Sequence, residues 1–152
     1  INDYNLETST RKLDSLVAYV NWLKSKSAPI DGIGTQMHIS ISTDTTAIKN
    51  AFIKMASTGL LVRISELDVI INTSKVASFT PTTDQLTQQA KMYYWVVRSY
   101  NKNVPASQRY GITVWGVHDP DSWITNDAPL LFDANYKKKS AYSGFVQALK
   151  AN

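Results

Sequence analysis

Strand-like and helix-like segments alternate along this chain, and no other feature limits its possible folds as strongly. Apolar residues at helical spacing, with Ser and Thr ahead of them, mark the first helix, and Pro29 ends it. The predicted helices are, in order, Leu13–Leu23, Thr43–Ser57, Leu86–Val97 and Ser140–Ala151, and the predicted strands are Ile1–Leu6, Ile30–Ile39, Leu60–Ile71 and Gly111–Val117. Strands that alternate with helices predict right-handed crossovers and a parallel sheet.

The segment Leu60–Ile71 is almost continuously apolar, as expected for a parallel strand covered on both faces. Two architectures accommodate such units: an open doubly wound sheet, or part of a (β/α)₈ barrel, which needs eight units and about 250 residues. An open sheet often carries a glycine-rich phosphate loop. This chain has only 6 glycines and no such motif. We therefore expect an α/β fold that corresponds to half of a (β/α)₈ barrel.

Composition narrows the classes of function. The 152 residues suit one domain, and we treat 1–152 as a single one. Cysteine is absent, which excludes disulfides and thiolate metal sites. The net charge is +4, but the only basic run is Lys137–Lys139, so we expect no nucleic-acid partner. No apolar stretch approaches the ~20 residues of a membrane span. Because the first residue is Ile1 rather than Met, we expect that an upstream segment has been removed, cut or left out.

Polar and aromatic side chains gather where the predicted strands end. They are Tyr4, Asn5 and Glu7 after the first strand, Gln36 and His38 on the second, Glu66 and Asp68 on the third, and Trp115, His118, Asp119, Asp121 and Trp123 after the fourth. In a barrel, these carboxyl ends converge on one mouth, where the active site lies. Alternation along a strand predicts that Glu66 and Asp68 share a face.

Three of these residues form a candidate catalytic row. His38 can hold Glu66 ionised, and Asp68 can fix the tautomer of His38, which suits a carboxylate nucleophile. Each residue also has a structural interpretation: Glu66 paired with Arg63, His38 as a satisfied core histidine, and Asp68 as a turn or salt-bridge residue. A metal site is a further alternative, but neither H-x-H nor H-E-x-x-H spacing supports it.

The tryptophans divide into two groups. Trp22 and Trp95 lie inside helical patterns, and we interpret both as packing residues. Trp123 lies in a polar loop, where an exposed indole is unfavourable without a partner. Flat aromatic faces can pack against sugar rings, so Trp115 and Trp123 are candidate sugar-binding residues, with core packing and loop anchoring as the alternatives.

Five segments together resemble the second half of the catalytic barrel of glycoside hydrolase family 10, whose members are endo-β-1,4-xylanases. They are NDYN (Asn2–Asn5), IDGIGTQMH (Ile30–His38), ISELDV (Ile64–Val69), WGVHDPDSW (Trp115–Trp123) and PLLFD (Pro129–Asp133). The resemblance covers nearly the whole chain, in the same order. It implies strands five to eight of the barrel, xylan or xylo-oligosaccharides as substrate, and no cofactor or metal.

The resemblance also implies residue roles. Glu66 resembles the nucleophile, His38 the histidine that hydrogen-bonds it, and Asp68 the residue that supports that histidine. The substrate-binding positions that it implies are Gln36, Trp115, Trp123, Tyr4 and Asn5. Asp119 matches the acidic position of the tryptophan loop. Three places depart from the family pattern: His118, which we expect at most to line the cleft, Ile124 and Lys137–Ser140.

The general acid/base of this family is the Glu of an Asn-Glu pair, and no such pair occurs in this chain. Glu7, Asp68 and Asp119 are the local carboxylates, and none matches that motif. We therefore expect a segment that supplies the nucleophile only, is inactive alone and needs the N-terminal half of the barrel, in the same protein or as a second chain. The alternatives are a carbohydrate-binding remnant and a structural half-barrel that pairs with itself. Polymeric xylan predicts an extracellular, cell-surface or periplasmic location.

Overall fold

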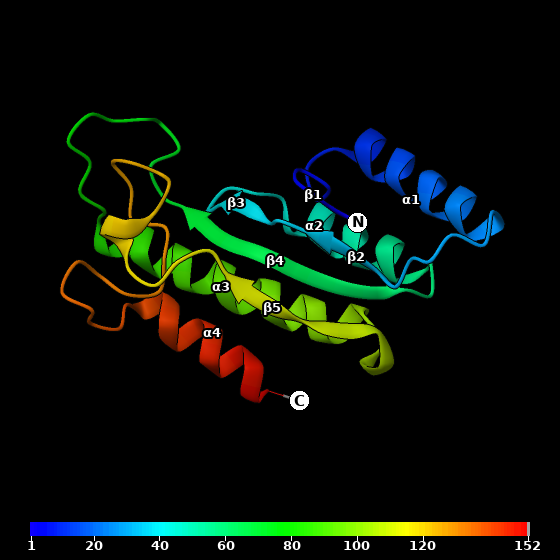
Figure 1. Cartoon of the computed structure of the whole chain (residues 1–152). Helices are drawn as coiled ribbons and strands as arrows, with labels where there is room; N and C mark the ends of the chain where they lie inside the picture. The colour runs from blue at the N-terminus through cyan, green and yellow to red at the C-terminus, as the bar shows by residue number, and fades with distance from the viewer. Residues whose placement is uncertain (152) are drawn as a thin grey trace. The chain divides into compact units, whose positions relative to one another are not determined.

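The computed structural model describes residues 1–151 and confirms the predicted alternation of strands and helices. The strands are β1 (Asn2–Asp3), β2 (Gly32–Thr35), β3 (His38–Ser40), β4 (Leu61–Ile70) and β5 (Arg109–Val114); the helices are α1 (Thr10–Ser25), α2 (Thr45–Ala56), α3 (Thr83–Asn103) and α4 (Ser140–Lys150) (Figure 1). Two short 3₁₀ turns cover Ala106–Gln108 and Asp119–Asp121.

The strands pair in the order expected of consecutive barrel strands. β1 pairs with β2, and both β2 and β3 pair with β4, all in parallel. β5 pairs with β4 as well. The parallel sheet inferred from the alternating pattern is therefore confirmed, with β4 as the central strand and α-helical connections between neighbours.

The second predicted strand, Ile30–Ile39, is broken in the structure. Thr35 pairs with Ile64, and His38 pairs with Asp68. Three residues of β4 between these pairs therefore face only two residues, Gln36 and Met37, between β2 and β3. Met37, one of those two, is fully buried and has a φ of 67°, which no strand residue adopts. This bulge ends β2 and starts β3, and bulges commonly re-aim side chains near active sites.

The described residues form two compact units. The first comprises Ile1–Met37, Asp44–Glu66 and Ser99–Thr113; the second comprises His38–Thr43, Leu67–Arg98 and the chain from Val114 onward. In the first unit, Tyr100 donates its hydroxyl proton to the Val62 carbonyl at 2.7 Å. In the second, Tyr93 donates to the Pro129 carbonyl, also at 2.7 Å. Burial raises the pKa of both phenols, so they remain neutral donors.

The helices begin where the sequence supplies capping side chains. Ser9 accepts a hydrogen bond from the Lys12 N–H at the start of α1, and Asp44 accepts one from the Thr46 N–H at the start of α2. The interpretation of Trp22 as a packing residue is wrong. Its side chain is 53% exposed on the outer side of α1 and stacks on Tyr19, with ring centroids 5.8 Å apart.

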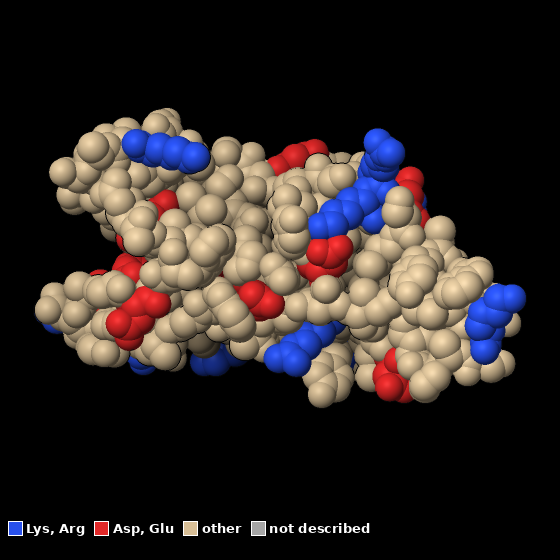
Figure 2. All heavy atoms as spheres, turned by 45° about the horizontal axis from the view of Figure 1, so that its top comes forward, with Lys and Arg blue, Asp and Glu red and all other residues tan. Residues whose placement is uncertain are grey.

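The surface carries charge in scattered positions. On the face seen in Figure 2, Lys and Arg side chains are separated by stretches of uncharged surface. None of the helices within residues 1–151 is long and apolar enough to cross a membrane.

Candidate active site

Glu66 lies in the middle of β4, where Asn2 of β1 and Gln36, just after β2, contact it within the first unit. Its side chain is half-buried, and its Oε1 lies 3.4 Å from the Asn2 Nδ2 atom of β1. Its backbone N–H donates to the Gln36 carbonyl at 3.0 Å, just where β2 has ended. The chain therefore fixes the backbone of Glu66 on one side and places an amide donor beside its carboxylate on the other.

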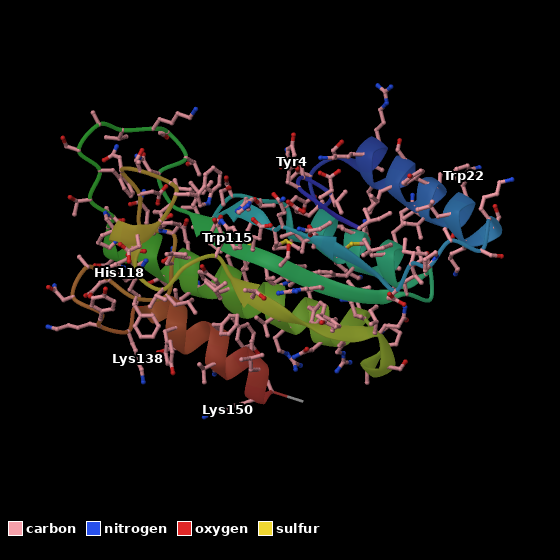
Figure 3. The ribbon with its side chains drawn as sticks, viewed as in Figure 1. Tyr4, Trp22, Trp115, His118, Lys138 and Lys150 are labelled. Atoms are coloured by element: carbon pink, nitrogen blue, oxygen red, sulfur yellow. The ribbon has the colours of Figure 1, made fainter. Side chains whose placement is uncertain are left out.

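Tyr4 and Asn5 lie in the turn between β1 and α1 (Figure 3). Tyr4 is 53% exposed, and the Lys12 ammonium lies 3.5 Å from the centroid of its ring. Lys12 also donates to Asp3 at 2.8 Å, and this hydrogen bond holds the pKa of the Asp3 carboxyl below its usual 3.8. Asn5 adopts a φ of 58°, and its carbonyl accepts from the Ser9 N–H. The turn thus presents Tyr4 outward, braced by Lys12.

Glu7 is one of only two glutamates in the chain, the other being Glu66. The structure buries Glu7 to 2% exposure, and the Thr35 hydroxyl donates to its Oε2 at 2.9 Å. A carboxylate enclosed in this way holds a strand in place and is not presented to a substrate.

In the second unit, Asp68 gathers two of the other predicted site residues. The His38 Nδ1 and the Trp123 Nε1 each lie 2.8 Å from the same Asp68 oxygen, Oδ2. The His38 and Trp123 rings meet edge to face, with centroids 4.9 Å apart. Because a carboxylate only accepts, Asp68 holds the proton of His38 on Nδ1, which makes Nε2 the acceptor nitrogen of the ring. Asp68 itself is fully buried.

The two predicted sugar-binding tryptophans are both exposed. Trp115 follows β5 directly and is 45% exposed, while its backbone N–H donates to the Leu67 carbonyl at 3.0 Å (Figure 3). Trp123 is 60% exposed even though its indole N–H is bound to Asp68. Gly116 has a φ of 142°, and a Cβ there would lie 2.7 Å from a Leu130 methyl, so the turn after Trp115 needs glycine. Both indoles therefore offer apolar faces that the described chain does not cover.

The loop that carries Trp123 is fastened by a buried ion pair, which we call the Asp119–Lys139 clamp. The Lys139 ammonium lies 2.9 and 3.0 Å from the two Asp119 oxygens and donates to the Ala128 and Leu130 carbonyls at 2.6 and 2.8 Å. Asp119 Oδ1 also accepts from the Leu130 N–H at 2.8 Å. Burial raises the pKa of Asp119 and lowers that of Lys139, outweighing their mutual attraction.

Nothing in the sequence alone assigns a role to Lys139, which stands at the end of the basic run Lys137–Lys139. The only available signal was a departure from the family pattern over Lys137–Ser140. His118 was expected at most to line the cleft. In the structure it is buried and stacks on Tyr136, with centroids 4.1 Å apart, and its Nδ1 lies 3.1 Å from Asp121. It packs the loop instead of facing a cleft.

No group of three or more His, Asp and Glu side chains within residues 1–151 is arranged to hold a metal ion. The carboxylate of Glu66 contacts the amide of Asn2, and that of Asp68 contacts an imidazole and an indole.

Comparison with known proteins identifies the family. The family model described as glycosyl hydrolase family 10 matches residues 1–148. The chain belongs to glycosyl hydrolase family 10.

Relatives in this family align over almost all of the chain. The endo-β-1,4-xylanase Xyn10C of Cellvibrio japonicus is 39% identical over 97% of this chain, which spans 27% of that protein. The structure of a thermostable mutant of a xylanase, Xyn10A, from the same organism superposes with a TM-score of 0.90 at 37% identity, over 99% of this chain and 49% of that one. Xylanase 10C of Cellvibrio japonicus in complex with xylopentaose superposes with a TM-score of 0.89 at 37% identity, over 97% of this chain and 33% of that one.

The chain therefore spans between about a quarter and about half of the length of these relatives. The structural neighbours are (β/α)₈ barrels, and this chain is an α/β half of such a barrel, as the strand count predicted.

Proposed function

We propose that this chain supplies the nucleophile half of a retaining endo-β-1,4-xylanase and works as part of a complete barrel. The observation that carries the proposal is the match to family 10 over residues 1–148, together with the placement of Glu66 on β4 beside an amide donor. The named relatives are xylanases, and one neighbour holds xylopentaose, which supports xylan and xylo-oligosaccharides as the substrate class.

In the proposed reaction, a Glu66 oxygen attacks the anomeric carbon of a xylosyl unit. The bond from that carbon to the leaving sugar oxygen breaks, and a general acid protonates the leaving oxygen. The sugar is then an ester of Glu66. Water, deprotonated by the same acid/base residue, attacks the anomeric carbon and releases the Glu66 carboxylate with net retention.

The second-unit residues have supporting roles in this proposal. His38, its Nε2 left as an acceptor by the contact with Asp68, takes the role of the histidine that orients the nucleophile, as the resemblance implies. The exposed faces of Trp115 and Trp123 suit sugar rings, and Gln36, Tyr4 and Asn5 complete the substrate-binding set. Trp123 also links substrate binding to the nucleophile's support, because its indole N–H shares an Asp68 oxygen with His38.

The second carboxyl group belongs to the other half of the barrel. A retaining glycosidase needs its two carboxyl groups about 5–5.5 Å apart. Glu7 is buried against Thr35, Asp68 is bound by two donors, and Asp119 is held in the clamp, so each local carboxylate has a structural partner. We therefore propose that the chain alone is inactive and that the N-terminal half is its partner, with an extracellular, cell-surface or periplasmic location.

A second candidate function, carbohydrate binding without hydrolysis, is favoured by the exposure of both tryptophans. It requires no acid/base residue. Turnover by a complete barrel separates it from the enzymatic proposal.

The test compares three samples: a complete barrel that includes this chain, its Glu66→Gln variant and the isolated chain. We expect reducing sugar to be released from xylan by the complete barrel only, with xylo-oligosaccharide binding retained by Glu66→Gln. Asp84→Asn, an exposed carboxylate at the start of α3, serves as the control and should keep wild-type turnover. Near-wild-type turnover by Glu66→Gln, or hydrolysis by the isolated chain, would overturn the proposal.

A further inference from the structure

The amide of Asn2 is held on one side by a hydroxyl and faces Glu66 on the other. Ser65 donates its hydroxyl proton to the Asn2 Oδ1 at 2.9 Å. The Asn2 Nδ2 lies 3.4 Å from the Glu66 Oε1. The three residues come from β1 and β4, which are not neighbours in the sheet, because β2 runs between them. The Asn2 side chain therefore crosses over β2 to reach β4.

Gly34 of β2 makes this crossing possible. A Cβ at Gly34 would lie 2.4 Å from the Asn2 Oδ1, closer than real Cβ contacts come, and 3.1 Å from its Cγ, which is tight. The backbone of Gly34 pairs directly with Asn2 in the sheet. The Asn2 amide fills the space that glycine leaves here, and a larger residue would push the amide aside.

We infer that Asn2 is a positioning residue for Glu66, oriented by Ser65 and admitted by Gly34. This inference rests on the proposed role of Glu66 as the nucleophile. The substrate-binding residues that the family resemblance implies do not include Asn2, Ser65 or Gly34.

The orientation of the amide follows from its two neighbours. A hydroxyl can donate or accept, whereas an ionised carboxylate only accepts, so Nδ2 must face Glu66 and Oδ1 must face Ser65. Ser65 has a second acceptor, the Thr35 carbonyl at 3.3 Å, but the contact with Asn2 is shorter. The opposite orientation would place two oxygens against each other.

The contact between Asn2 and Glu66 is long for a hydrogen bond and suits a free enzyme. Hydrogen bonds to catalytic groups are often long without substrate and tighten in the reacting complex. Donation from Nδ2 to one carboxylate oxygen fixes the rotation of the carboxylate and directs its other oxygen toward the attacked carbon. A nucleophile that is oriented in advance loses less freedom on the way to the transition state.

The test is a double-mutant cycle in a complete barrel that includes this chain, with Asn2→Ala, Gly34→Ala and the two combined. The substrate is an aryl β-xylobioside with an activated leaving group, because its glycosylation step needs little help from the acid. We expect each single variant to lower kcat/KM by about tenfold, as for a lost hydrogen bond to a charged group. The xylo-oligosaccharide Kd should stay unchanged.

The combined variant decides between positioning and general damage. If Gly34→Ala acts only by pushing the amide away, it adds nothing once Asn2 is alanine, since the new Cβ would lie an ordinary 3.4 Å from the Asn2 Cβ. We therefore expect the combined variant to equal Asn2→Ala. Losses that multiply to about a hundredfold would overturn the inference.

A second pair of variants covers the case in which Gly34→Ala fails to fold. Ser65→Ala should lower kcat/KM with an unchanged Kd, and Ser65→Thr, which keeps the hydroxyl, should recover most of that loss. Wild-type kcat/KM in Asn2→Ala and Ser65→Ala, with Glu66→Gln inactive, would overturn the inference and leave the proposed function standing. Activity in Glu66→Gln would overturn the proposed function itself.

Discussion

At the scale of single residues, Asp68 is the group on which most of the second unit's site depends. One of its oxygens accepts from both His38 and Trp123, and the other, Oδ1, is buried with no hydrogen-bond partner among residues 1–151. A single oxygen of Asp68 therefore holds both the imidazole of His38 and the indole of Trp123 in place.

The variant Asp68→Asn tests this conclusion. An asparagine can present its oxygen to His38 and Trp123, but its NH₂ group would then occupy the place of the buried Oδ1, and the charge would be lost. We expect kcat of the complete barrel on xylan to fall by about tenfold or more, with binding less affected. Steady-state kinetics beside Asp84→Asn measure this, and equal activity of the two variants would contradict the role assigned to Asp68.

The sequence located some of these residues better than others. We predicted Glu66 and Asp68 at a strand end, whereas the structure places both inside β4, with Glu66 at its middle. The sequence alone indicates no role for Asn2, because the reach of its amide depends on Gly34, which is distant along the chain and adjacent only in the sheet. The exposure of Trp22 was also missed, since an apolar residue at a helical position does not reveal which face it lies on.

At the scale of elements, β4 was predicted to within one residue at each end, as Leu60–Ile71 against the observed Leu61–Ile70. Its high apolar content, rich in β-branched residues, indicates a buried strand. The break between β2 and β3 was not predictable from periodicity. It depends on the positive φ of Met37, which the surrounding packing imposes on a residue that does not favour it.

The Asp119–Lys139 clamp is the ion pair that joins the two ends of the loop between β5 and α4. Lys139→Met would leave the largely buried Asp119 without its cation and would remove a donor from the Leu130 and Ala128 carbonyls, of which Ala128 keeps the Gln89 amide. We expect a loss of about 3–5 kcal/mol in the free energy of unfolding of the complete barrel. Denaturant unfolding measures it, and Lys137→Met, an exposed neighbour, should change it by less than about 0.5 kcal/mol.

The loss should depend on pH in a definite direction. The hydrogen bond from Lys139 lowers the pKa of Asp119 against the raising effect of burial, so in Lys139→Met the folded-state pKa of Asp119 is higher still. The contribution of Lys139 to the free energy of unfolding is therefore complete above the pKa that Asp119 has in the variant. It is lost as the pH falls through that pKa. A difference in stability that stays constant, or grows, toward acid pH would contradict the clamp as described.

At the scale of the whole molecule, the family 10 match and the parallel (β/α) order agree that this chain is half of a barrel. The sequence could predict this because strand count and order are local properties. The sequence alone predicts less about the chemistry of the full reaction. Of the two glutamates, Glu7 is buried against Thr35, and Glu66 lies in the middle of β4 beside the Asn2 amide.

The central claim is that Glu66 forms the covalent glycosyl-enzyme, and trapping that intermediate tests it directly. A complete barrel that includes this chain would be treated with a 2-fluoro xylobioside bearing an activated leaving group, then digested and examined by peptide mass spectrometry. The account predicts a single added xylobiosyl mass on the peptide that contains Ile64–Val69, located on Glu66. A label on any other residue, or full turnover with no label formed, would contradict it.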